Sequence, residues 1–98
     1  MTDSLSILAA LAEPTRMGAM RLLWPGRELC VCELMEQLGV SQSRMSRHMA
    51  LLKAAGLVAD RRDAQWVRYR RAPELSAPIV ALIEAAFAVS KPRKRHAA

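Results

Sequence analysis

The sequence predicts a mostly α-helical domain that carries one small β-hairpin. Of its 98 residues, 52% are hydrophobic but only 4% are aromatic, so leucine, alanine, methionine and valine must build a core that favours helices. The segment 66–70 instead alternates with a period of two, which is typical of a strand. A chain of this length forms one domain and buries only part of its apolar surface, so we expect a homodimer.

Two helices open the chain. Ser4 can cap a first helix, which ends before Pro14 because the residue ahead of a proline disfavours the α region. Pro14 then suits the first turn of a second helix, which continues to about Trp24. Pro25 and Gly26 stop this second helix.

The next two helices form a predicted helix-turn-helix. The apolar positions between Cys30 and Leu38 fit one helical face, and Gly39 permits the left-handed residue that ends a helix. Ser41 caps the second helix, and polar residues group near its start. Two short helices joined by a glycine-containing turn are typical of this motif. Three apolar side chains line the packing face of the second helix: Met45, Met49 and Leu52.

A β-hairpin follows, which would be the wing of a winged helix-turn-helix. Leu57 and Val58 open a short strand, residues 60–65 form a charged turn, and residues 66–70 make the return strand. Arginines are expected at the tip and along the return strand, where they would contact DNA. The alternative is a solvated hairpin edge that its charge protects from aggregation.

The last helix carries a wide apolar stripe and runs from beyond Pro73 to about Ser90. Such a stripe is too large for the surface of a soluble monomer, so we expect the first and last helices to form the dimer interface. Residues 1–90 are therefore one domain, and the basic segment 91–98 is a flexible tail. The residues expected at the interface are Leu5, Leu8, Ile79, Leu82, Ile83 and Phe87.

The charge of the chain points to double-stranded DNA as its partner. A net charge of +6 and a pI of about 10.4 are the electrostatic signature of a nucleic-acid binder. A recognition helix reads the major groove, and two such helices in a dimer, about 34–36 Å apart, predict an inverted-repeat operator. For His48, a phosphate contact or partial burial as a neutral ring are alternatives to reading a base. The candidate DNA-binding residues are Ser41, Gln42, Ser43, Arg44, Ser46, Arg47, His48, Arg61, Arg62 and Arg68.

Cys30 and Cys32 begin the first helix of the helix-turn-helix, where the helix dipole and Arg27 should favour thiolates. Thiolates are the ligands that soft ions prefer. Residues two apart do not share a face of a regular helix, so both sulfurs can bind one ion only if the first turn is irregular or unwinds. Closing this chelate would distort the helix and shift the recognition helix. The alternative is a pair of small buried hydrophobic residues.

Several expectations concern location and chemistry. No apolar run approaches the roughly 20 residues of a membrane span, and no signal peptide is recognisable, so we expect a cytoplasmic protein without a membrane partner. In that reducing compartment a cysteine pair indicates a metal or redox site rather than a structural disulfide. An enzyme is not expected, because the two histidines, His48 and His96, form no recognisable pairing with a nucleophile.

Several motifs together resemble the ArsR/SmtB family of bacterial metal-responsive repressors, over roughly residues 5 to 88. The resemblance implies a transcriptional repressor whose inducer, arsenite or antimonite, binds Cys30 and Cys32. The family's usual third cysteine position holds Met35, a poor ligand, and no zinc site is carried over to the last helix, where only Glu84 could ligate. A wing turn that commonly holds glycine has Ala64. The segments that carry the resemblance are 11–16, 28–34, 41–43, 46–52, 56–58, 61–62 and 66–70.

Two other functions stay open at this point. One is a redox-sensing repressor of the same fold, in which the cysteine pair is oxidised instead of binding an ion. The other is a constitutive DNA-binding protein whose cysteines are structural. An arsenite titration without oxygen separates the first alternative from the metalloid sensor, and a lack of any response identifies the second.

Overall fold

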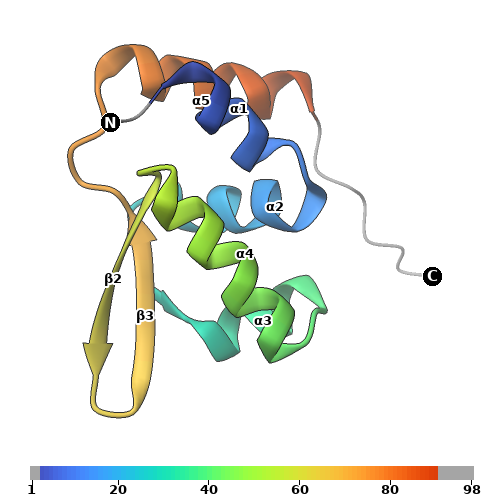
Figure 1. Ribbon diagram of the computed structural model, residues 1–98, viewed down its shortest axis with the longest axis vertical. Coiled ribbons are helices and arrows are strands. Elements are labelled where there is room, and N and C mark those ends of the chain that lie inside the picture. The colour runs from blue at the N-terminus through green and yellow to red at the C-terminus, as the bar shows by residue number, and fades with distance from the viewer. Residues whose placement is uncertain (1–2, 91–98) are drawn as a thin grey trace.

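The computed structural model describes residues 3–90, so the predicted tail 91–98 lies outside the described residues. Within them are five helices and one three-stranded sheet, which confirms the mostly α-helical winged helix-turn-helix (Figure 1). No helix of this part of the chain is long and apolar enough to cross a membrane. The elements are α1 (Ser4–Leu11), α2 (Pro14–Leu23), β1 (Leu29–Cys30), α3 (Val31–Leu38), α4 (Gln42–Ala54), β2 (Val58–Asp63), β3 (Trp66–Arg71) and α5 (Ala77–Val89).

The first two helices start at carboxylate caps. Asp3, not Ser4, caps α1, since its Oδ1 accepts from the Ser6 N–H at 2.8 Å and Ser4 already lies in the helix. Glu13 caps α2 in the same way, and Pro14 occupies the predicted first turn, where its missing N–H costs nothing. The predicted cap of the first helix was therefore wrong by one residue.

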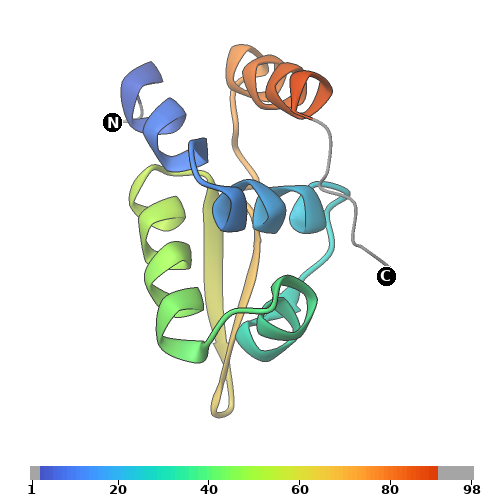
Figure 2. The same cartoon turned by 90° about the vertical axis from the view of Figure 1, so that its right-hand side faces the viewer.

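The helix-turn-helix has the predicted bounds. Gly39 ends α3 with a left-handed φ of 68° and donates its N–H to the carbonyl of Met35, and Ser41 caps α4. The predicted packing face of α4 is fully buried in a core shared with α2, α3 and α5. Figures 1 and 2 show α2 between two ends of the molecule: α1 and α5 lie at one end, and α3, the start of α4 and the hairpin tip lie at the other, while the end of α4 reaches α1.

The wing differs from the prediction in its turn. Strands β2 and β3 stay paired up to Asp63 opposite Trp66, so the connecting loop has two residues and the expected turn over residues 60–65 is wrong. Ala64 makes this short loop possible by adopting a left-handed φ of 59°. Arg61 and Arg62 consequently lie within β2 and not at the tip.

A third strand, β1, was not predicted. It has only two residues, and it pairs antiparallel with β3 so that Leu29 lies opposite Tyr69 and Cys30 opposite Arg68. Two residues are too few for a periodic pattern, so only the tertiary pairing defines this strand. The cysteine pair is thereby joined to the wing.

The predicted dimer surface is exposed in part. Leu5 is 77% exposed and Leu8 is 46% exposed on α1. Ile83 of α5, by contrast, is fully buried in the chain's own core, so its assignment to the dimer interface was wrong. Its helix face turns toward α2 because that face completes the core of the single chain. The other predicted interface residues are half-buried: Ile79, Leu82 and Phe87.

Candidate functional site

The N-terminal half of α4 presents a polar surface. Its packing face is buried, so the residues between the packing positions turn outward. Ser41 caps the helix with its Oγ 3.4 Å from the Arg44 amide nitrogen, and the first amides of the helix point the same way, as an anion site requires. The predicted DNA-binding residues that are exposed here are Ser41, Gln42, Ser43, Arg44, Ser46 and Arg47.

His48 occupies a different environment, with a side chain only 15% exposed. Its Nδ1 lies 3.0 Å from an η-nitrogen of Arg16 and 3.8 Å from Oε1 of Glu13. Sequence analysis missed the link to Arg16. Nothing local could have indicated it, because Arg16 and His48 are 32 residues apart and meet only when α2 packs against α4.

The wing arginines divide into two groups. Arg61 forms a two-bond ion pair with Glu28, at 2.8 Å for each bond, and Arg68 binds Asp63 at 2.9 Å. The hydrogen bonds from Arg61 lower the pKa of Glu28, and the same bonds raise the pKa of Arg61. The side chain of Arg62 is exposed and forms no hydrogen bond or ion pair within residues 3–90.

The faces of the sheet explain this division. Residues directly opposite in an antiparallel pair share a face, so Arg61, Arg68 and Cys30 form one row across the three strands. Arg62 lies opposite Val67, on the other face. The cysteine pair therefore adjoins the two internally paired arginines. Arg62 and Arg70 are the exposed wing arginines that have no hydrogen bond or ion pair within residues 3–90.

The cysteines converge without any change in α3. Cys30 is the N-cap, with an extended backbone at φ −81° and ψ 165°, whereas Cys32 lies in the first helical turn. Their Sγ atoms are 2.7 Å apart. The expectation allowed an irregular start of the helix or an unwound first turn. The structure has the irregular start, because Cys30 lies outside the regular helix, so no unwinding is needed.

The pKa of Cys32 also differs from the expectation. The pKa of Cys32 is raised, first by the hydrogen bond to the Cys30 sulfur, then by burial and by the charge that Cys30 would carry. Arg27, which was expected to favour the thiolates, donates from its Nε to the Leu22 carbonyl. Glu33 accepts from the Cys30 N–H at 2.8 Å, and that backbone bond lowers the pKa of Glu33.

Two thiols are the candidate ligands at this site. Within residues 3–90 no group of three or more histidine, cysteine, aspartate or glutamate side chains could hold a metal ion. Met35, one turn beyond Cys32, is half-buried and packs against the core. On α5, the carboxylate of Glu84 accepts a hydrogen bond from the indole N–H of Trp24 at 3.0 Å.

A winged helix-turn-helix with an exposed polar recognition helix defines a DNA-binding transcriptional regulator and not an enzyme. The comparison with known families agrees: residues 13–60 match the family described as bacterial regulatory protein, arsR family. The arsenical resistance operon repressor of Escherichia coli K12 is 41% identical over 83 residues, which are 85% of this chain and 71% of that protein. The chain belongs to the arsR family.

Other relatives support this assignment. The arsenic resistance transcriptional regulator ArsR2 of Pseudomonas putida is 48% identical over 69 residues, which are 70% of this chain and 60% of that protein. Among solved structures, HlyU from Vibrio cholerae has a TM-score of 0.75 at 35% identity. The match covers 88% of this chain and 89% of the HlyU chain. A homodimeric winged helix-turn-helix DNA-binding domain from Mycobacterium bovis has a TM-score of 0.72 at 27% identity, over 87% of this chain and 75% of its own. The chain is thus a transcriptional repressor of the arsR family.

Proposed function

We propose that this repressor binds an inverted-repeat operator as a homodimer and is released when arsenite or antimonite binds Cys30 and Cys32. The observation that carries the proposal is the pair of thiols 2.7 Å apart at the start of α3, in the helix-turn-helix itself. It is supported by relatives 41% and 48% identical that are described as arsenic-resistance regulators.

The chemistry of the pair fits a thiophilic ion. Arsenous acid carries three hydroxyl groups, and each thiol that attacks the arsenic loses a proton while one hydroxyl leaves as water. Two thiols thus form two sulfur–arsenic bonds and release two waters. The third position on arsenic would keep its hydroxyl or take a small-molecule thiol, because Met35 packs against the core. Soft thiolate ligands favour such ions over hard ones.

The location of the pair supports a coupling to both DNA-binding elements. Cys30 belongs to β1, opposite Arg68 of the wing, and also caps α3. An ion held by both sulfurs would fix the angle between β1 and α3, and with it the angle between the wing and the helix-turn-helix. The repressor with the ion would then fit DNA differently from the repressor without it. Release requires such a difference in DNA affinity between the two states.

The dimer is supported by the exposed apolar residues of α1. Leu5 and Leu8 lie at the end of the molecule away from the helix-turn-helix, where α5 also lies (Figure 2). The similar domain from Mycobacterium bovis is described as homodimeric. Two recognition helices facing away from such an interface would meet successive major grooves about 34–36 Å apart.

The decisive experiment follows operator release by fluorescence anisotropy, without oxygen, using the DNA upstream of the chain's own gene. Arsenite should release the wild type, whereas Cys30→Ser and Cys32→Ser should bind DNA with wild-type affinity and not respond. Met35→Leu is the matched control, since it keeps the packing without the sulfur and should respond like the wild type. Serine variants that respond like the wild type would contradict the proposal.

Redox sensing by the same pair is the second candidate, and the 2.7 Å between the sulfurs is the observation that favours it. A disulfide would need them to approach to about 2.05 Å. Hydrogen peroxide in place of arsenite tests this function in the same assay. Release by peroxide alone would identify a redox sensor, and release by neither would identify a constitutive DNA-binding protein.

A further inference from the structure

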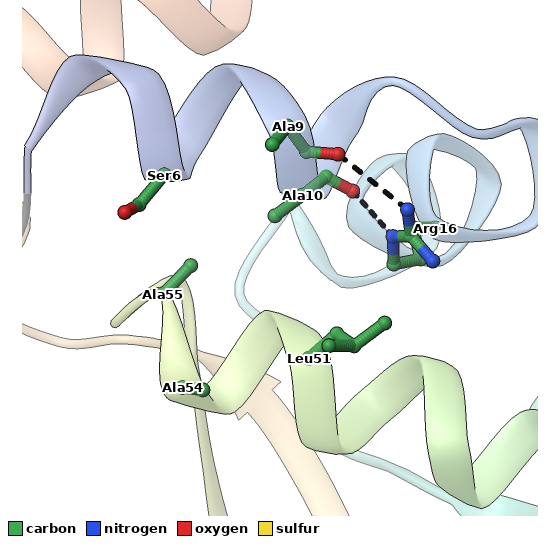
Figure 3. A pocket seen from close by; sticks show the side chains of 7 residues that line it. All are labelled: Ser6, Ala9, Ala10, Arg16, Leu51, Ala54 and Ala55. Atoms are coloured by element: carbon green, nitrogen blue, oxygen red, sulfur yellow. Dashed lines mark hydrogen bonds between the residues drawn. The ribbon is translucent and has the colours of Figure 1, made fainter.

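Arg16 connects three helices. It lies in the first turn of α2, where its Nε donates to the carbonyl of Ala10 at 2.6 Å and one η-nitrogen donates to the carbonyl of Ala9 at 3.4 Å (Figure 3). Both carbonyls belong to the last turn of α1, where helix carbonyls lack partners within the helix. The other η-nitrogen lies 3.0 Å from Nδ1 of His48 on α4.

Beside Arg16 the two helices α1 and α4 are separated by a hollow. This cavity of about 320 Å³ is lined mainly by alanine side chains from both helices, together with Ser6 and Leu51 (Figure 3). Side chains this short bridge the gap poorly. Arg16 therefore provides a polar connection between the end of α1 and the middle of the recognition helix.

The contact also defines the proton on His48. A guanidinium group stays protonated and can only donate, so Nδ1 must accept and the ring proton must sit on Nε2. All fully buried side-chain nitrogen and oxygen atoms of residues 3–90 have hydrogen-bond partners, and Nε2 has none there. Nε2 therefore reaches the surface, one helical turn from the exposed Arg44.

We propose that Arg16 is a positioning residue for DNA binding, which holds His48 in its Nε2–H form so that this N–H donates to a DNA phosphate. The Oε1 atom of Glu13 also lies near the ring, 3.8 Å from Nδ1. The proposal rests on DNA binding by α4 and is independent of the inducer site, so its failure would leave the arsenite response untouched.

The tautomer is tested first, by nuclear magnetic resonance of ¹⁵N-labelled histidine. The chain has two histidines, so His96→Ala leaves a single ring signal. The spectrum should show a protonated Nε2 and an accepting Nδ1, and Arg16→Ala should shift the ring toward a mixture of the two tautomers. An Nδ1–H ring in the protein with Arg16 intact would overturn the proposal without any further variant.

DNA affinity is tested next, without inducer. Arg16→Ala should weaken operator binding about two- to threefold, because only part of the population would keep the competent Nε2–H form. The same change should cost little in a His48→Gln background, where the amide nitrogen supplies a donor that does not depend on Arg16. Arg27→Ala is the matched control, since it removes an arginine that also binds a backbone carbonyl and should leave affinity nearly unchanged.

Salt dependence separates positioning from direct contact. A neutral imidazole donor releases no counterion, so Arg16→Ala should keep the wild-type slope of log affinity against log salt. A slope reduced by about one would mean that Arg16 itself neutralises a phosphate, and it would overturn the proposal. Unchanged affinity in a folded Arg16→Ala or Arg16→Lys variant, checked by circular dichroism, would overturn it as well.

Discussion

At the scale of single residues, the backbone of Cys30 decides the chemistry of the thiol pair. Its extended conformation at the N-cap turns its sulfur back over the first turn of α3, within 2.7 Å of the Cys32 sulfur. Inside a regular helix the same spacing would point the two side chains about 200° apart. The two thiols are therefore adjacent, and the hydrogen bond between them raises the pKa of Cys32.

The raised pKa predicts how the reactivity of Cys32 depends on pH. Because its pKa is raised, Cys32 should react slowly with iodoacetamide at pH 7, and the rate should climb as rising pH converts the thiol to the thiolate. Cys30→Ala removes the first cause of the shift, so the pKa should fall and the rate at pH 7 should increase several-fold. Mass spectrometry of the labelled peptide gives the rates, with the urea-unfolded chain as reference. Identical pH profiles for the two proteins would refute the coupling.

Arg47 should contribute directly to operator recognition. It is exposed on α4, opposite the buried Met45 and Met49, so Arg47→Ala should leave the fold intact. Loss of a base contact should cost ~1–3 kcal/mol of binding free energy, measured by anisotropy on operator DNA. Lys53→Ala is the matched control, because Lys53 lies on the same helix but its Nζ is 3.0 Å from a carboxylate oxygen of Asp60. Equal losses for both variants would indicate a general effect of charge.

At the scale of elements, the three-stranded sheet sorts the wing arginines by face. On the face of Cys30, Arg61 and Arg68 are neutralised by Glu28 and Asp63, which offset the repulsion between these two opposite residues. Arg70 shares this face but is exposed and has no ion pair within residues 3–90. The other face holds Arg62 near the free end of the hairpin. Wing contact with DNA should thus depend on which arginines lack an internal carboxylate partner and not on the number of arginines.

A comparison of two neighbouring variants tests this conclusion. Arg62→Ala should weaken operator binding and reduce the salt slope by about one, as the loss of one phosphate contact requires. Arg61→Ala should have a smaller effect on both, since Arg61 already forms two bonds of 2.8 Å with Glu28. The measurement is anisotropy at several salt concentrations. A larger loss from Arg61→Ala would show that the Glu28 pair opens on DNA.

At the scale of the whole molecule, aromatic and cationic side chains pack α5 against α2 and the base of the wing. The Trp24 ring meets the Phe87 ring edge-on, with centroids 5.5 Å apart, and the Arg71 guanidinium lies 4.1 Å from the centre of the Trp24 ring. Arg21 lies over Phe87 and donates to the carbonyls of Phe87 and Ser90. A partner that packs on α1 and α5 would therefore contact elements fixed to the base of the wing.

The dimer is tested at α1, because Ile83 serves the chain's own core. Leu8→Asp should convert the dimer to a folded monomer and weaken binding to the full inverted repeat, since a charge would be buried in the interface. Leu51→Asp is the control, as Leu51 is 48% exposed on α4 and lies outside the proposed interface. Sedimentation analysis reports the mass. A dimeric Leu8→Asp variant, or a monomeric wild type at micromolar concentration, would contradict the interface.

The sequence by itself determined the helices and the packing side of the recognition helix. Gly39 and Ser41 mark one helix end and the next helix start through interactions within four residues, and the stripe of Met45 and Met49 follows from the helical period. The positive charge is likewise a property of composition. These features are local, so no knowledge of distant contacts was needed.

Only the tertiary structure decided the rest of the site. Strand β1, the ion pairs of the wing and the burial of Ile83 depend on residues far apart in the chain. The link between Arg16 and His48 depends on how α2 crosses α4. Even the two cysteines, one residue apart, meet because β1 pairs with β3 and holds Cys30 extended outside the helix. The physical reason is that each of these contacts forms only when several elements pack together, whereas a local pattern carries information about one element at a time.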